Sequence, residues 1–123
     1  MRKGASFIFG RAICYELQAI GTSVYEYHTA RGAWPQSAAD LARTSLPARL
    51  RYWREGLESG RTVVAWPRNW KSNPKDNSTH VLAYYTAGLI SEVGRNWVLW
   101  GDLSTEYLSK DRLKAALTAQ AMK

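Results

Sequence analysis

The sequence has few of the residues that cross-link a chain, bind metal ions or attack substrates. Its 123 residues include one cysteine, Cys14, and two histidines, His28 and His80. A single cysteine excludes a disulfide within the chain. Neither histidine has a cysteine or second histidine at the close spacing that is typical of zinc sites. We therefore expect the protein to bind no metal ion and no cofactor.

Catalytic motifs are missing as well. The sequence contains no GxSxG, GxxxxGK[ST] or GxGxxG motif, and its glutamates are scattered. The only thiol–imidazole combinations are Cys14 with His28 or with His80. Cys14 and His28 fall on one predicted helix, about 21 Å apart along its axis, whereas a pairing with His80 stays open. Because Cys14 adjoins the apolar side of that helix, we expect a buried, inert thiol and a protein that is not an enzyme.

Long apolar runs are also absent. No stretch approaches the roughly 20 apolar residues of a membrane-spanning helix. The opening MRKGASFIFG is basic and then apolar, but Gly10 and Arg11 end the apolar patch, and no small-residue cleavage site follows. We expect no membrane span and no signal peptide. Residues 1–10 are expected to be either disordered or the remnant of a leader.

The remaining composition is typical of a folded domain. Hydrophobic residues make up 46% of the chain and charged residues 22%, close to the averages of globular proteins. A chain of this length buries roughly two-thirds of its unfolded surface, so a core can form without metals or cross-links. We expect residues 1–123 to form a single domain.

The first half of the chain carries helical patterns. From Arg11 to Arg31, apolar residues recur at alternating steps of four and three, which predicts an amphipathic helix. Gly32 and Pro35 are typical of its end. A short second helix is predicted by the capping-box-like Ser37–Asp40, and residues 47–60 fit either a helix or an extended segment. The stripe of the first helix consists of Ile13, Leu17, Ile20, Val24 and Tyr27.

The second half carries β-strand patterns and a final helix. Gly101-Asp102 predicts a hairpin turn between the last two strands, and Ser109 predicts the N-cap of a helix with Leu113 and Leu117 on its apolar face. Helices followed by strands and a helix indicate an α+β fold with an antiparallel sheet. We expect a long N-terminal helix packed on that small sheet, and a short C-terminal helix. The predicted strands are Thr62–Trp66, His80–Thr86, Asn96–Trp100 and Ser104–Leu108.

Several segments resemble a known family. LQAIGTSVYEYH at 17–28, GAWP at 32–35 and SAADL at 37–41 resemble the helix and exit of bacterial type II secretion pseudopilins and related pilin-like proteins. VLAY at 81–84, VLWGD at 98–102 and YLS at 107–109 resemble the end of the same family, so the likeness covers about residues 13–41 and 80–118.

The resemblance implies a pilin-like fold and a structural or assembly role in a secretion or pilus-type system. Its partners would be other subunits of that assembly, and its location extracytoplasmic, in the periplasm. The chain departs from the family pattern at Phe9, where a glutamate is expected, and at Gly10-Arg11, where the apolar helix stops. By this comparison we expect the filament-forming half of a pilin helix to be missing, so that the chain is either truncated or trimmed, or a pilin-like domain put to another use. Asp102-Leu103 replaces the usual Asp-Gly, which leaves the turn type open.

Positive charge gathers in the middle of the chain. The formal net charge is +7. The stretch from Arg43 to Lys75 contains eight basic residues and only two acidic ones, Glu55 and Glu58. Aromatic residues interleave with them, and we call Arg49–Arg54 together with Trp66–Lys71 the basic–aromatic belt. It fits a core with a solvated rim, a protein interface or a single-stranded nucleic-acid site. The residues that we expect to bind partners are Arg49, Arg51, Arg54, Arg68, Trp70 and Lys71.

The polar segment Lys71–Thr79 is expected to be an exposed loop. The resemblance raises the question of calcium, because some pseudopilins hold this ion in a loop near the end of the sheet. The candidate ligands here would be Asn73, Asp76 and Asn77, but they include one carboxylate and lie beside lysines. A calcium ion needs more negative oxygen than this, so we expect a solvated turn. The glycosylation match at Asn77 is discounted, because three-residue matches arise often by chance.

Overall fold

The computed structural model describes residues 2–44, 47–86 and 95–121. The sheet contains four strands in the order β1-β2-β3-β4, and every neighbouring pair is antiparallel. The predicted α+β fold, with a long N-terminal helix, an antiparallel sheet and a short C-terminal helix, is confirmed. In chain order the elements are α1 (Arg2–Arg31), α2 (Ala38–Thr44), α3 (Pro47–Ser59), β1 (Thr62–Val64), the 3-10 helix η1 (Pro74–Asn77), β2 (Val81–Tyr85), β3 (Arg95–Trp100), β4 (Thr105–Ser109) and α4 (Lys110–Ala121).

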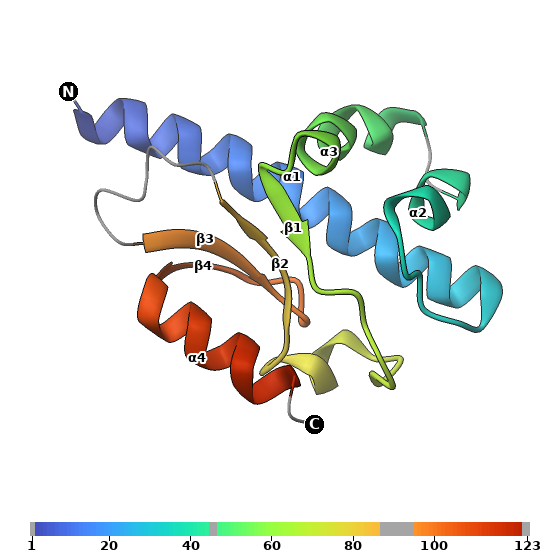
Figure 1. Ribbon diagram of the computed structural model, residues 1–123. Coiled ribbons are helices and arrows are strands. Elements are labelled where there is room, and N and C mark those ends of the chain that lie inside the picture. The colour runs from blue at the N-terminus through green and yellow to red at the C-terminus, as the bar shows by residue number, and fades with distance from the viewer. Residues whose placement is uncertain (1, 45–46, 87–94, 122–123) are drawn as a thin grey trace.

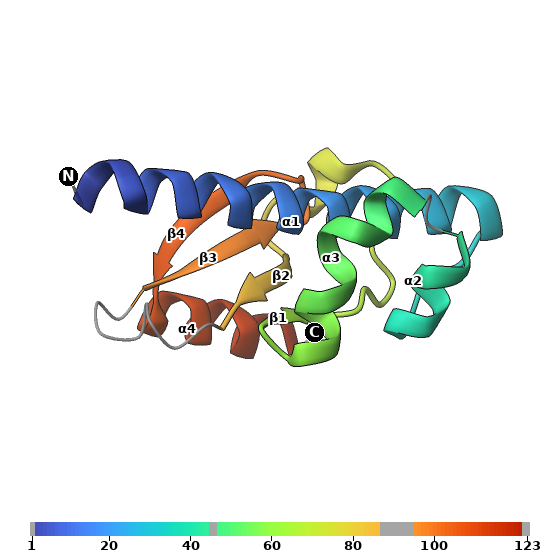
Figure 2. The same ribbon diagram turned by 90° about the horizontal axis from the view of Figure 1, so that it is seen from above.

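Helices cover both faces of the sheet. Figures 1 and 2 show α1 along one face and α4 along the other, with α2 and α3 beside α1. The main core lies between α1 and the sheet, and the smaller one lies between α4 and the opposite face. The main core contains Ile13, Leu17, Ile20, Val24, Leu41, Trp53, Val64, Leu82, Ala83 and Leu99. The smaller core contains Val81, Val98, Leu108 and Leu113.

Helix α1 has the predicted apolar face and end but begins earlier, at Arg2 rather than Arg11. The side chains of its stripe from residue 13 to 24 are buried, and Tyr27 is half-buried. At the other end, Gly32 has a φ of 71°, and its N–H donates to the carbonyl oxygen of His28 at 2.8 Å. Glycine adopts this left-handed conformation without a Cβ clash, which explains why the helix ends here.

Local caps fix the two shorter predicted helices. The hydroxyl of Ser37 accepts a hydrogen bond from the N–H of Asp40 at 3.1 Å, as the N-cap of α2. The Asp40 carboxylate accepts from the N–H of Gln36 at 3.1 Å, one residue before the position that a capping box would use. The hydroxyl of Ser109 caps α4 by accepting from the N–H of Arg112 at 3.3 Å.

The segment that fitted either a helix or a strand is helix α3, and it buries Trp53 against α1. The strand that follows is shorter than predicted, because β1 ends at Val64. Ala65 adds one further bond, from its N–H to the carbonyl oxygen of Leu82 at 2.8 Å. Pro67 then has no N–H to donate, so the ladder cannot continue through it.

The β3–β4 hairpin contacts α1 through an unusual turn residue. The N–H of Leu103 donates to the carbonyl oxygen of Trp100 at 2.9 Å, and Leu103 has a φ of 71°. This arrangement is a three-residue hairpin loop whose left-handed position is usually glycine. The Leu103 side chain packs on Gly21 of α1, where an added Cβ would lie 2.5 Å from Leu103 Cδ2 and 2.8 Å from Leu99 Cδ2. Packing on α1 therefore offsets the strained backbone of Leu103.

A buried carboxylate ties α1 to α3 and β1. Glu16 of α1 is only 9% exposed, and it accepts hydrogen bonds from Arg61 Nη2 at 3.0 Å and from the hydroxyl of Thr62. Gly56 of α3 lies directly over it, since a Cβ there would approach Glu16 Oε2 to 2.6 Å. The hydrogen bond that Arg61 donates to the Glu16 carboxylate raises the pKa of Arg61 above its ordinary value. A carboxylate in this position is stable only while its partners stay in place.

Replacing Glu16 tests this connection. Glu16→Ala leaves Arg61 and Thr62 without their partner and opens space under Gly56, so we expect a loss of about 2–3 kcal/mol in the free energy of unfolding. Glu55→Ala is the matched control, since the exposed Glu55 lies 3.8 Å from the same guanidinium and its loss should cost about 0.5 kcal/mol or less. Urea denaturation measures both, and equal losses would contradict the connection.

Crowding between α1 and the hairpin gives a second prediction. Gly21→Ala improves helix propensity by about 1 kcal/mol but forces its Cβ into Leu103 and Leu99, so we expect a net loss of about 1–2 kcal/mol. In a Leu103→Ala background the same substitution should cost less, because one of the two obstructing side chains is gone. A double-mutant cycle by thermal or urea unfolding measures this coupling, and strictly additive effects would count against it.

Candidate functional site

The structure divides the basic–aromatic belt in two. Arg49, Arg51 and Arg54 belong to α3, which precedes β1, whereas Trp66–Lys71 belong to the segment that follows β1. Figure 1 shows α3 at the upper edge of the molecule and the second segment at the lower edge. The side chains of Arg49 and Arg51 lie outside the part that the structure describes. The described members of the belt therefore come from two elements, one before and one after β1.

Two members of the belt on α3 have described side chains, Trp53 and Arg54, and each contacts other residues of the fold. Trp53 is 1% exposed and belongs to the main core. Arg54 is exposed, and its Nε lies 2.9 Å from Glu58 Oε1, one helical turn away. Exposed pairs of this kind contribute little to stability. Because the guanidinium of Arg54 is already paired with the Glu58 carboxylate, it is less available to an acidic partner than its sequence position predicted.

The second segment keeps three of the predicted residues together. Arg68 and Lys71 are exposed, and Trp70, which lies between them in the sequence, is half-buried. The buried Pro67 anchors the segment, since its carbonyl oxygen accepts from Gln36 Nε2 at 2.9 Å. At Asn69 the backbone has a φ of 56°, a conformation that asparagine tolerates better than most residues. Partner binding by Arg68, Trp70 and Lys71 stays a prediction, and the structure shows that the three share one segment.

Both histidines stack on tryptophans beside it. The ring centroids of His28 and Trp34 are 3.9 Å apart with an interplanar angle of 20°, and those of Trp70 and His80 are 5.0 Å apart at 24°. Trp34 and Trp70 meet edge to face at 6.2 Å. We call these four side chains the histidine–tryptophan stack. Sequence analysis missed it, because its members come from four separate segments; the GAWP exit after His28 was the only local signal.

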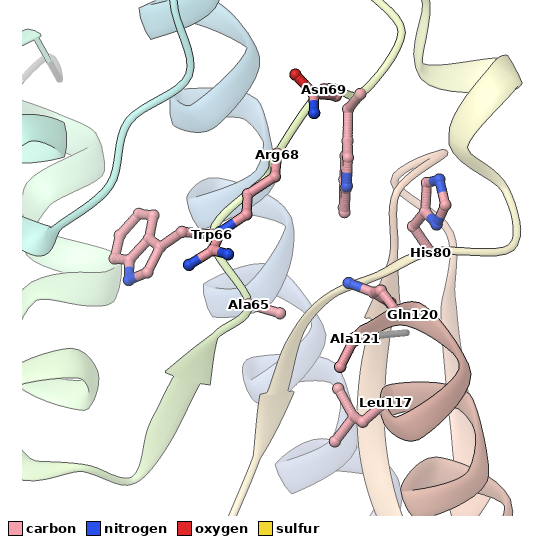
Figure 3. A pocket seen from close by; sticks show the side chains of 9 residues that line it. Ala65, Trp66, Arg68, Asn69, His80, Leu117, Gln120 and Ala121 are labelled. Carbon is pink, nitrogen blue, oxygen red and sulfur yellow. The ribbon is translucent and has the colours of Figure 1, made fainter. Parts of the chain in front are cut away.

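An open hollow lies between the second segment and the end of α4. Its volume is about 760 Å³, within the range of small-ligand sites. Figure 3 shows the Arg68 side chain extending along the segment toward Trp66, and Leu117 and Gln120 projecting from α4 on the other side. Indoles and small apolar side chains complete the wall. We call it the Arg68 hollow; its described lining is Ala65, Trp66, Arg68, Asn69, Trp70, His80, Leu117, Gln120 and Ala121.

Two contacts hold the walls of the hollow in place. The Gln120 side chain pairs with the β2 backbone like a neighbouring strand: its Oε1 accepts from the N–H of Val81 at 2.7 Å, and its Nε2 donates to the Val81 carbonyl oxygen at 2.9 Å. The Trp70–His80 stack fixes the opposite wall. Because both walls are attached to β2, the hollow does not depend on a ligand for its shape.

The predicted exposed loop Lys71–Thr79 is organised around a buried residue. Ser72, Asn73 and Lys75 are exposed as expected, but Asn77 is 0% exposed. Its amide donates to the hydroxyl of Tyr25 and to the carbonyl oxygen of Lys71, each at 2.8 Å, and accepts from the Lys71 N–H at 3.1 Å. The prediction of a solvated turn is therefore wrong at Asn77. Its amide is also inaccessible to glycosylation in the folded chain.

Tyr25 connects this loop to α1 and to the β3–β4 turn. Its hydroxyl donates to the carbonyl oxygen of Gly101 at 2.5 Å while accepting from Asn77. Gly101 has no room for a larger residue, since a Cβ there would lie 2.4 Å from the Asn77 carbonyl oxygen. Burial raises the pKa of Tyr25, and the hydrogen bond from Asn77 opposes this shift only in part.

The thiol and both imidazoles of the chain lie in the part that the structure describes. Cys14 is half-buried, where a fully buried thiol was expected. The ring of His28 stacks on Trp34, and that of His80 on Trp70. Within residues 2–44, 47–86 and 95–121, no group of three or more His, Cys, Asp or Glu side chains could hold a metal ion.

Alkaline pH tests the Tyr25 contact. Burial also raises the pKa of Tyr85, so both phenols bind their protons more tightly in the folded than in the unfolded chain. Their contribution to stability is complete below the unfolded pKa, about 10, and is lost as pH rises through the higher folded pKa. We expect stability to fall above about pH 10, and Tyr25→Phe to flatten this fall while lowering stability at neutral pH. Urea titrations at several pH values measure both effects; an unchanged slope in Tyr25→Phe would contradict the assignment.

Comparisons with known proteins leave the family open. No protein-family model matches the chain, and neither the curated proteins nor the solved structures include a significant match. Among the helices that the structure describes, none is long and apolar enough to cross a membrane.

Proposed function

We propose that the chain is a non-enzymatic, pilin-like subunit of a secretion or pilus-type assembly, and that it acts through contacts with other protein subunits. The observation that carries this proposal is the shape of α1. The helix has 30 residues, and both ribbon views show its first turns reaching beyond the other described elements along the length of the molecule. A helix that extends past the rest of its domain offers a surface on which neighbouring subunits can pack.

The order of elements supports the same proposal. A long helix ends at Gly32, Trp34 returns to stack on His28, and a short capped helix follows before the antiparallel sheet. The segments that resemble pilin-like proteins occupy these positions in the structure: the helix, its exit, and the final strands with the closing helix. An extracytoplasmic location is part of this proposal.

The outer side of α1 is available for contacts in the globular part of the chain. Ala12, Tyr15 and Gln18 are exposed, on the side opposite the buried Ile13 and Leu17. Tyr15, at 56% exposure, is the exposed large hydrophobic side chain of the described part. Tyrosine is enriched at protein interfaces, because it offers a large rigid contact area with a polar end.

The alternative is a small basic domain that binds single-stranded nucleic acid. That mode needs aromatic faces on which bases can stack between cations. Here Trp53 is in the core, a face of Trp34 stacks on His28, and a face of Trp70 stacks on His80. Trp66 remains as a half-buried candidate. The occupied faces favour a protein partner over a nucleic acid.

Site-specific photo-cross-linking tests the proposal. We replace Tyr15 with p-benzoylphenylalanine, irradiate cells that produce the chain together with its native neighbours, and identify the adducts by mass spectrometry. The expected result is a discrete adduct whose partner is joined through its own long N-terminal helix, because in the proposed assembly the exposed outer side of α1 packs on the same helix of a neighbouring subunit.

Position 111 provides the matched control. Asp111 is exposed in the first turn of α4, at the opposite side of the sheet and outside the lining of the Arg68 hollow, and the same photoreactive residue there should give no such adduct. The proposal fails if positions 15 and 111 give the same products, or if position 15 gives only adducts with nucleic acid.

A further inference from the structure

We infer that the Arg68 hollow binds a short acidic peptide segment of a partner protein, in which a carboxylate lies next to an apolar side chain. The inference names the chemistry of the partner. It rests on the proposed function in one respect, which is that the peptide segment belongs to another subunit of the assembly. The site is separate from the outer side of α1, because its walls come from the segment after β1 and from α4.

The charge of the hollow is the first reason. Arg68 is exposed and forms no ion pair or ring contact within the part of the chain that the structure describes. No described residue that lines the hollow is acidic. The other arginines whose side chains are described each face a carboxylate or a ring; these are Arg31, Arg43, Arg54, Arg61 and Arg112.

The apolar part of the wall is the second reason. Trp66 and Trp70 flank Arg68 in the sequence, and Leu117 contributes from α4. Tryptophan and arginine dominate the binding energy of protein interfaces, where an anchor enters a pocket that water leaves. A guanidinium beside indoles and a leucine therefore suits a ligand that carries a carboxylate and an apolar group close together, as an acidic peptide does.

The rigidity of the hollow is the third reason. Gln120 is bonded in both directions to Val81, and His80 holds Trp70 by stacking. The segment is also tied down at Pro67 by Gln36. Since the walls are already ordered, a peptide would not have to supply the free energy of ordering them.

The net charge argues against a second copy as the occupant. The chain carries a formal charge of +7, so two copies repel each other, whereas an acidic partner is attracted over a distance set by the ionic strength. Nucleic acid shares the attraction, but one face of Trp70 is taken by His80, so Trp66 is the lining indole with no stacked ring among the described contacts on which a base could stack. An acidic peptide fits both the charge and the shape.

Titration with defined peptides tests the inference. The probe is an acetylated, amidated tetrapeptide of two aspartates between two leucines, added to the ¹⁵N-labelled full chain and followed by NMR. We expect saturable shifts in the amides of residues 65, 66, 68–70 and 117–121 below about 5 mM peptide, the weak end of specific binding. The same peptide with asparagines in place of aspartates should bind at least about tenfold more weakly.

Two variants separate a local site from general electrostatics. Arg68→Glu should weaken the aspartate peptide at least about tenfold, whereas Arg54→Glu, with the same change in net charge on α3, should change it less than about twofold. Both residues are exposed, and circular dichroism confirms that each variant is folded. The inference is overturned by no saturable shift, by equal binding of the asparagine peptide, by equal effects of the two variants, or by shifts that map elsewhere.

A thymidine octanucleotide is the competing probe. If it shifts the amides of residues 65, 66 and 68–70 at lower concentration than the aspartate peptide, the hollow is a nucleic-acid site and the inference is wrong. The outcome is independent of the cross-linking at Tyr15. If the peptide binds but position 15 gives no helix-to-helix adducts, the inference about the Arg68 hollow stands and the proposal of a pilin-like assembly fails. If such adducts form but the peptide does not bind, only the inference about the hollow fails.

Discussion

The fold depends on one buried carboxylate. Glu16 lies under α3 and is bonded by Arg61 and Thr62 at the start of β1. Apolar burial would hold α1 against the sheet in many registers, because hydrophobic contact is not directional. A carboxylate that loses its partners when a helix slides by one residue allows a single register. The position of α3 over α1, and of the segment after β1, follows from it.

Much of the fold could be predicted from local patterns. The apolar stripe, Gly32, Ser37 and Ser109 act within a few residues of one another, so periodicity and capping predicted α1, α2 and α4 and the final hairpin. The length of α1 could not be predicted from periodicity, since its stripe was recognisable only from Arg11 onward. The choice of a helix for α3 depended on Trp53 reaching the core, which is a tertiary contact.

The candidate site was predicted less well, because its parts are distant in sequence. The sequence analysis grouped Arg54 and Arg68 in one belt on charge density alone, but Arg54 belongs to α3, before β1, and Arg68 to the segment after β1. The stack of His28 with Trp34 and of Trp70 with His80 joins four segments, and no spacing rule connects them. Asn77 looked like a solvated turn residue because its neighbours are polar. Its burial comes from Tyr25, on a helix near the other end of the chain.

The strained turn at Leu103 has a consequence for how the chain folds. Its left-handed backbone is unfavourable in an isolated hairpin and is offset only when the side chain reaches Gly21. The β3–β4 hairpin therefore gains its full stability only after α1, from the opposite end of the chain, has docked. Such a requirement raises the contact order and slows folding relative to a hairpin that closes by itself. During synthesis on the ribosome, the contact between Leu103 and Gly21 can form only after the last strands have emerged.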